Sequence, residues 1–229
     1  MFHTALEPWY ARQMLKRIAL IAGGLIVVLA IVIATRPGHL HVERSLPMPV
    51  PSAVVYSLLN DFNVWPSWSP WEKLDPDMKR EVSGAPTGVG AKYAWVGNDQ
   101  VGSGSMEIME SKPDQIKIRL EFKEPFAATN VTTFVLVPTA SSAGAPGTRV
   151  TWAMDGENNF AAKAMGMFMD MDAMIGKDFE SGLANLGALA EGDAELKAAS
   201  RGELPPAPAG VVEPAAGSAG AGSAGSGAH

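Results

Sequence analysis

The sequence contains no cysteine among its 229 residues. Disulfides, metal sites built on thiolates and a cysteine nucleophile are therefore all excluded. The absence leaves the compartment open, because many exported domains also lack cysteine. Any catalytic or binding chemistry must come from other side chains.

Histidine is scarce as well, and its four copies stand at His3, His39, His41 and His229. All four lie outside what we expect to be the body of the folded domain. A transition-metal site needs imidazole and carboxylate groups that converge. We therefore expect no metal site, and no cofactor is predicted.

An excess of basic residues is also missing. The chain has 18 lysines and arginines against 24 acidic residues, a formal net charge of −6 and a pI near 5.2. Non-specific binding of nucleic acid depends on a basic face. Nucleic acid is therefore not expected as a partner.

A long apolar run does stand near the N-terminus, where Ile18–Thr35 reads IALIAGGLIVVLAIVIAT without a charge. At about 1.5 Å per residue this run spans roughly 27 Å, close to the hydrocarbon thickness of a bilayer. We expect it to be a single transmembrane anchor, with the membrane as its partner. The alternative is a cleaved signal peptide, whose apolar region would be only about 7–15 residues long and would end in an A-x-A-like site.

Basic residues flank this run unequally, with Arg12, Lys16 and Arg17 before it and only Arg36 and Arg44 after it. Positive charge favours the cytoplasmic side of a membrane. The N-terminus is therefore predicted to lie in the cytoplasm. The protein would be a single-pass protein of the bacterial inner membrane, with its domain on the extracytoplasmic side.

Four segments follow from these patterns. Residues 1–17 form the cytoplasmic N-terminus, 18–35 the anchor, and 39–191 one domain, because Pro37-Gly38 ends the first helix. Residues 192–229 are rich in Pro, Ala, Gly and Ser. Such a segment cannot bury enough apolar surface to offset its ordering entropy, so a disordered tail is predicted.

The domain alternates between strand and helix patterns. Strands are expected at 39–46, 78–82, 90–96, 102–110, 115–122, 129–137 and 148–155, and helices at 53–61 and 161–191. Pro47, Pro49 and Pro51 are expected to end the pairing of the first strand. The predicted fold is α+β, with a curved antiparallel sheet of about six or seven strands wrapped around the long C-terminal helix.

Within the domain, four stretches carry a family resemblance: PSAVVYSLLNDFNVWPSWSPW, GVGAKYAWVGN, GSGSMEIME and QIKIRLEF. The chain from 39 to 191 resembles the START-like (SRPBCC) superfamily with its helix-grip fold, and specifically its bacterial polyketide cyclase/dehydrase-like branch. This resemblance implies a cavity between the sheet and the long helix that holds a lipid, sterol, polyketide or other apolar molecule. Some members of the superfamily are enzymes, so the resemblance leaves activity open.

Large apolar side chains are the candidates for lining such a cavity. They are Trp65, Trp68 and Trp71 from the turn-rich segment, Tyr93, Trp95 and Phe122 from the strands, and Phe168, Met171, Met174 and Ile175 from the long helix. The alternative is that the tryptophans and methionines simply fill the core, where aromatic residues dominate burial. We expect Phe168, Met171 and Met174 to share the face of the helix that meets the sheet.

The polar side chains give weaker evidence for a catalytic site than the apolar ones give for a cavity. Several carboxylates lie around the long helix (Asp155, Glu157, Asp170, Asp172, Asp178), and most of them should be solvated. Tyr93, Glu107 and Arg119 alternate with apolar strand residues. We expect them to point outward, and the alternative is that they point inward, as an enzyme would require. Catalytic residues therefore cannot be named from the sequence.

Three functions remain open. The favoured one is a membrane-anchored domain that binds a hydrophobic or lipid-like small molecule. The second is a cyclase- or dehydratase-type enzyme that uses Asp or Tyr as acid–base groups. The third is a ligand-free interaction domain with a filled core.

Overall fold

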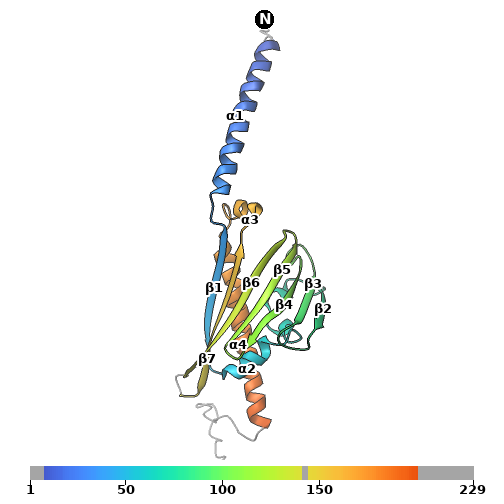
Figure 1. Ribbon diagram of the computed structural model, residues 1–229, viewed down its shortest axis with the longest axis vertical. Helices are drawn as coiled ribbons and strands as arrows, with labels where there is room; N and C mark the ends of the chain where they lie inside the picture. The colour runs from blue at the N-terminus through green and yellow to red at the C-terminus, as the bar shows by residue number, and fades with distance from the viewer. Residues whose placement is uncertain (1–7, 141–143, 201–229) are drawn as a thin grey trace, which may run out of the picture. The chain divides into compact units, whose positions relative to one another are not determined.

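The computed structural model describes residues 8–140 and 144–200 (Figure 1). Its elements are α1 (Pro8–Ala34), β1 (His39–Met48), α2 (Ser52–Leu59), the short 3-10 helices η1 (Trp65–Ser67) and η2 (Pro70–Lys73), β2 (Lys79–Gly84), β3 (Ala91–Val96), β4 (Ser103–Lys112), β5 (Gln115–Glu124), β6 (Ala128–Ala140), β7 (Pro146–Glu157), α3 (Phe160–Met165) and α4 (Met171–Ser200).

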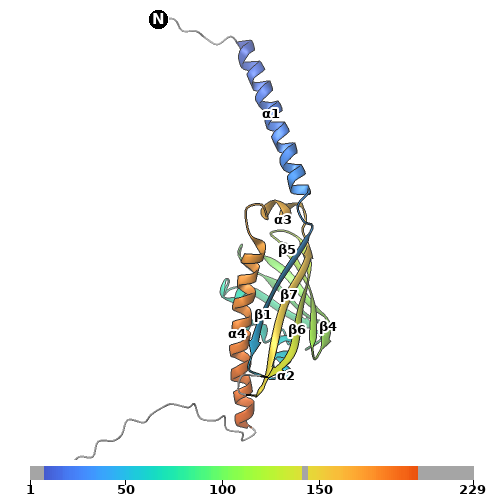
Figure 2. The ribbon, with the colours of Figure 1, turned by 90° about the vertical axis from the view of Figure 1, so that its left-hand side faces the viewer.

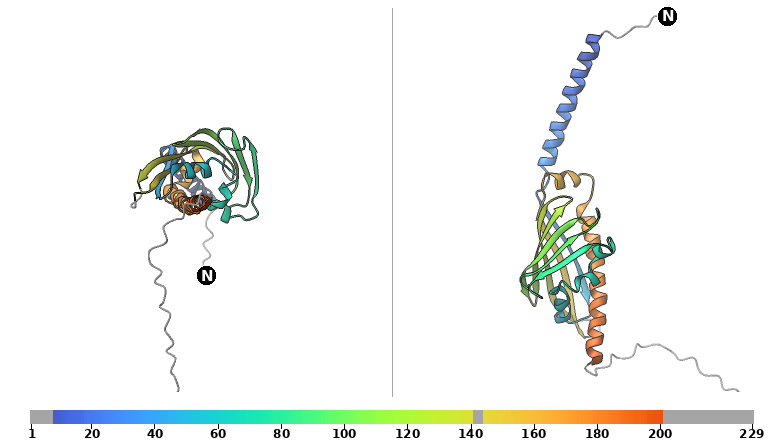
Figure 3. Two further views of the ribbon diagram at one scale, coloured as in Figure 1. Left: turned by 90° about the horizontal axis from the view of Figure 1, so that it is seen from below. Right: turned by 90° about the vertical axis from the view of Figure 1, so that its right-hand side faces the viewer.

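One antiparallel sheet of seven strands carries the domain, in the order β1-β7-β6-β5-β4-β3-β2. Consecutive strands from β2 to β7 pair as hairpins, and β1 closes the order by pairing with β7. The sheet curls around α4, which lies along its concave face (Figures 2 and 3). The predicted α+β helix-grip fold is therefore confirmed.

The first strand is longer than predicted. β1 continues to Met48, and Pro47 pairs in register with Arg149 of β7. The expectation that Pro47 would end the pairing was wrong. β1 is an edge strand, and proline is tolerated there because one side of the strand has no neighbour to receive an N–H bond.

The predicted single helix over 161–191 is two helices. α3 ends at Met165 with Gly166 as its C-cap, and α4 begins after Asp170, whose carboxylate accepts a hydrogen bond from the Ala173 amide at 3.0 Å. At the other end of α3, Asn159 caps the helix by accepting from the Ala162 amide at 2.9 Å. The two caps fix separate helix starts, so the chain turns between them.

The C-terminal helix is also longer than predicted. α4 continues past Glu191 to Ser200, so residues 192–200, expected as part of the tail, are helical. Alanine, glutamate, leucine and lysine dominate this stretch, and all are good helix formers. The predicted disordered tail over 201–229 lies outside the described residues.

Aromatic side chains fill the space between the sheet and α4. Trp152 of β7 stacks on Phe179 of α4 with ring centroids 4.1 Å apart and planes at 6°. Trp68 and Phe134 complete this group, with ring centroids 5.7 and 4.9 Å from Trp152. Gly182 lets α4 approach closely, because a Cβ there would lie 2.7 Å from the Trp152 ring.

A polar contact joins the edge strand to the helix. Arg44 of β1 reaches across to α4, where it binds the Asp172 carboxylate at 3.0 Å and Glu180 at 3.0 Å. Gly176 lies under this side chain, and a Cβ there would collide with the guanidinium. This contact fixes the start of α4 against β1.

The N-terminal helix is apolar and largely exposed. Over Arg12–Ala34 it is long and apolar enough to cross a membrane, and it is the one such helix among the described residues. It has the length and composition of a membrane anchor or of a signal sequence. Its last turn contacts α3, and Ile33 is buried there.

Candidate functional site

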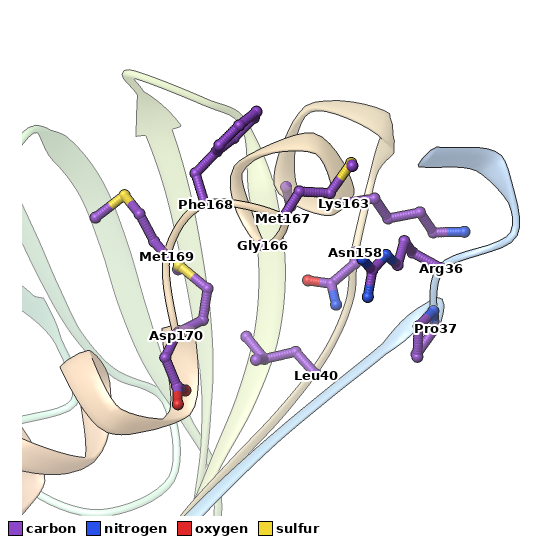
Figure 4. A pocket seen from close by; sticks show the side chains of 12 residues that line it. Arg36, Pro37, Leu40, Asn158, Lys163, Gly166, Met167, Phe168, Met169 and Asp170 are labelled. Atoms are coloured by element: carbon purple, nitrogen blue, oxygen red, sulfur yellow. The ribbon is translucent and has the colours of Figure 1, made fainter. Parts of the chain in front are cut away.

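A cleft of about 490 Å³ lies at the end of the domain where β1 begins (Figure 4). It is lined by Arg36, Pro37, Leu40, Asn158, Ala162, Lys163, Gly166, Met167, Phe168, Met169, Asp170 and Met171. The break between α3 and α4 supplies most of this lining. The residues that interrupt the predicted long helix therefore create the cleft.

The two sides of the cleft carry different kinds of side chain. Lys163, Arg36 and Asn158 are grouped on one side, whereas Met169 and Asp170 lie on the other (Figure 4). Phe168 is 85% exposed, which is unusual for a phenylalanine. The cleft thus combines flexible apolar side chains with two cations and one carboxylate.

Two of the predicted cavity residues, Phe168 and Met171, line this cleft. Met174 is not part of the cleft lining, and its side chain is 43% exposed on α4. The expectation that Phe168 and Met174 would face the sheet was wrong, since Phe168 precedes α4 and both side chains are exposed. Ile175 packs against the core from the same helix.

The three tryptophans of the turn-rich segment lie in the packed interior. Trp65 and Trp68 are buried with ring centroids 4.8 Å apart, and Trp65 donates to the Leu59 carbonyl at 3.0 Å. Trp71 is partly buried, with its ring 5.8 Å from Trp152. These contacts match the alternative that the tryptophans pack the short helices onto the sheet.

Trp95 of β3 and Phe122 of β5 form a second aromatic group across Gly104 of the intervening strand β4, with ring centroids 5.8 Å apart. Trp95 is held by a hydrogen bond to the Val101 carbonyl at 3.0 Å. Tyr93 is buried beside Trp95, so the expectation that it would point outward was wrong.

The hydroxyl of Tyr93 donates to Glu72 at 2.8 Å, and Glu72 also pairs with Arg80 at 2.6 Å. Burial first, and then the bond to Glu72, raise the pKa of Tyr93 above its ordinary value. The phenol is therefore protonated at neutral pH and is committed to a structural contact. It is poorly suited to act as a base.

Two indole N–H groups have no hydrogen-bond partner among the described protein atoms. They belong to Trp68 and Trp152, which are 1% and 2% exposed in the space between the sheet and α4. Unpaired buried donors are rare in folded proteins.

Two histidines also lie in the body of the sheet, contrary to the sequence-based expectation. His39 and His41 belong to β1, and Nδ1 of His41 lies 2.7 Å from Oδ1 of Asp155 on β7. This hydrogen bond raises the pKa of His41 above its ordinary value. The alternation of HLHVER was the available signal, but the pairing with a strand 114 residues away was not visible.

Similar solved structures include a protein from Chromobacterium violaceum (17% identity, 68% of this chain and 99% of that chain covered, TM-score 0.46). Others are major latex-like protein 151 from Panax ginseng (13%, 67% and 99%, 0.46) and truncated norcoclaurine synthase from Thalictrum flavum (12%, 66% and 92%, 0.48). No curated protein matches the chain.

A protein family matches the whole of the sheet and most of α4. The family described as "Polyketide cyclase / dehydrase and lipid transport" matches residues 39–191, which is more than half of the chain. Domains of this SRPBCC, helix-grip type typically bind a hydrophobic ligand. The chain therefore belongs to the polyketide cyclase/dehydrase and lipid transport family.

Proposed function

We propose that this protein is a membrane-anchored binding protein that holds one lipid-like molecule in the cleft between α3 and α4. The observation that carries the proposal is the position of that cleft. Arg36 and Pro37, which follow the apolar helix directly, are themselves part of the lining. A helix that crosses a bilayer would therefore keep the cleft next to the membrane surface.

Exposed apolar side chains around the cleft support this position. Phe160 is 57% exposed, Phe168 85% and Met169 44%, and all three belong to α3 or to the segment between α3 and α4. Large apolar side chains grouped on a surface are typical of a site for membrane or ligand contact. At a membrane interface they would contact acyl chains instead of water.

The charges favour an acidic amphiphile. Lys163 and Arg36 provide two cations on one side of the cleft, and methionines provide adaptable apolar surface. The carboxylate of Asp170 lies on the other side, where it accepts a hydrogen bond from the Ala173 amide. A fatty acid or an anionic phospholipid presents the matching combination of a negative head and an apolar chain. The cleft has a volume of about 490 Å³ and is open to its surroundings on one side.

The sidedness of the anchor completes the proposal. The basic residues in the N-terminal part of α1, which precede its uncharged run, favour a cytoplasmic N-terminus. The domain would then stand on the extracytoplasmic side of a bacterial inner membrane and take its ligand from that leaflet. The enzymatic alternative has less support, because the buried Tyr93 is bound to Glu72.

A binding titration tests the proposal. The full chain in nanodiscs is titrated with cis-parinaric acid, a fatty acid that fluoresces in apolar surroundings. We expect saturable binding that Met171→Trp weakens at least about tenfold, because the larger ring fills the cleft. Met174→Trp is the matched control: it adds the same ring at an exposed position of the same helix and should leave the affinity unchanged.

The proposal fails if the two variants bind the fatty acid as tightly as each other and as the unaltered chain. Binding that is lost equally in both variants would also count against it, since an exposed position of α4 would then matter as much as the cleft. A chain with no saturable binding at all would favour the ligand-free interaction domain.

A further inference from the structure

The outward face of β1 and β7 carries a group of imidazoles and carboxylates. His39 and His41 alternate with Leu40, which lines the cleft, so the two histidines point to the opposite face of the sheet. The strand register places His41 opposite Asp155 and His39 opposite Glu157. Side chains from residues far apart in sequence thus meet on one surface, separate from the cleft.

Three donor atoms converge there. Oδ1 of Asp155 lies 2.7 Å from Nδ1 of His41 and 3.3 Å from Nε2 of His39. One ligand atom from each of the three residues lies within 4.8 Å of the other two. Around a tetrahedral zinc ion with bonds of about 2.0–2.2 Å, neighbouring ligand atoms are roughly 3.3–3.5 Å apart. Small side-chain adjustments would bring the three atoms to that spacing.

We propose that His39, His41 and Asp155 form a binding site for one divalent transition-metal ion of the Zn²⁺ class. The ligand set is two imidazole nitrogens and one carboxylate oxygen, supplied by two adjacent strands of a rigid sheet. Three protein ligands leave a coordination position for water.

Two further carboxylates stand beside the three ligands. Oε1 of Glu157 lies 3.9 Å from Nδ1 of His39, and Oε2 of Glu43 lies 4.0 Å from Nε2 of His41. Their charge favours a cation at the centre of the group, and either could supply a further oxygen. Imidazole ligands favour zinc, copper and nickel over magnesium and calcium, which prefer oxygen ligands alone.

The exposure of the group permits an ion to enter and leave. The side chains of His39, His41 and Asp155 are 59%, 50% and 44% exposed. The site therefore needs no opening of the fold. The competing account is that the histidines only donate hydrogen bonds to Asp155, and this account predicts no uptake of metal.

Calorimetry with Zn²⁺ itself separates the two accounts. The full chain is purified in detergent with His3 and His229 both replaced by glutamine, which leaves His39 and His41 as its histidines. We expect one zinc ion per chain, and at least about tenfold weaker binding after His41→Gln or after Asp155→Asn. Asp114→Asn is the control, because it removes the same charge from an exposed turn between β4 and β5.

A second readout reports the ligands directly. Co²⁺ bound to a mixed nitrogen and oxygen site gives visible absorption bands that depend on coordination, and these bands should be lost in the His41→Gln chain. Circular dichroism in the presence of chelator verifies that each variant is folded. Zinc affinity in the Asp155→Asn chain equal to that of the Asp114→Asn chain would overturn the proposal, as would an unaltered chain that takes up no zinc.

Discussion

Single residues in the interior decide whether sheet and helix stay together. Phe179 is 1% exposed and its ring stacks on Trp152, so each of the two rings covers apolar surface of the other. Met174, less than two turns away on the same helix, is 43% exposed. The two positions therefore provide a direct comparison of buried and exposed sites on α4.

Phe179→Ala should lower the free energy of unfolding by about 3–5 kcal/mol, because it removes a buried ring and leaves a cavity. Met174→Ala should change it by less than about 0.5 kcal/mol, as expected for an exposed position. Denaturant unfolding followed by near-ultraviolet circular dichroism measures both. Equal effects of the two substitutions would show that the inner face of α4 has been assigned wrongly.

The contact between Arg44 and Asp172 makes the free energy of unfolding depend on pH. The guanidinium hydrogen bond lowers the pKa of Asp172 below its ordinary value. The carboxylate form is therefore favoured in the folded chain. Its stabilisation is present above the unfolded pKa of about 3.9 and is lost as the pH falls through the lower folded value.

Arg44→Gln should accordingly raise the pKa of Asp172 toward its ordinary value, and the loss of stability on acidification should become smaller. A nuclear magnetic resonance titration of the Asp172 carboxyl measures the shift. Lys177→Gln is the control, since it removes the same charge from α4. If Lys177→Gln shifts the pKa of Asp172 as much as Arg44→Gln does, the specific contact is refuted.

At the scale of elements, the sequence pattern predicted the strands, but it did not predict the break between α3 and α4. The alternation of QIKIRLEF predicts β5, because one face of the strand is buried and the period of two is clear. Residues 160–171 contain alanines and methionines that are compatible with helix throughout. Gly166 and Asp170 were the local signals that the helix is interrupted, but glycine and aspartate also occur inside helices.

The cleft was missed for the same reason. Its lining arises where the helix is interrupted, and only Phe168 and Met171 of the predicted ligand residues belong to it. The tryptophans were attractive as cavity residues, but their ring contacts place them in the packed interior. The sequence pattern also did not predict that β1 pairs with β7. The group formed by His39, His41 and Asp155 could therefore not be predicted either.

The cap at Asp170 tests the break between α3 and α4. Asp170→Ala should destabilise the start of α4 by about 0.5–2 kcal/mol, because the Ala173 amide loses its acceptor. Amide hydrogen exchange at Ala173 should then become faster. Asp170→Asn retains an N-cap acceptor and should preserve slow exchange. Fast exchange in both chains, or in neither, would contradict the cap.

At the scale of the whole molecule, the absence of cysteine allows clean topology mapping. A single cysteine at Ser83, on the exposed strand β2, should react with a membrane-impermeant maleimide in intact spheroplasts. A cysteine at Arg12 should react only after lysis, because that end is proposed to be cytoplasmic. The reverse pattern would invert the topology. A mature chain that lacks α1 by mass would identify a cleaved signal peptide.

The central proposal is that the apolar helix anchors the chain and that the domain holds a lipid-like ligand next to the membrane. Intact-mass spectrometry of the full chain released gently from detergent tests it most directly. The account predicts one bound molecule of lipid-like mass on the unaltered chain and on Met174→Trp, and its loss from Met171→Trp. An unaltered chain that carries no bound molecule, or a Met171→Trp chain that carries the same one, would contradict the account.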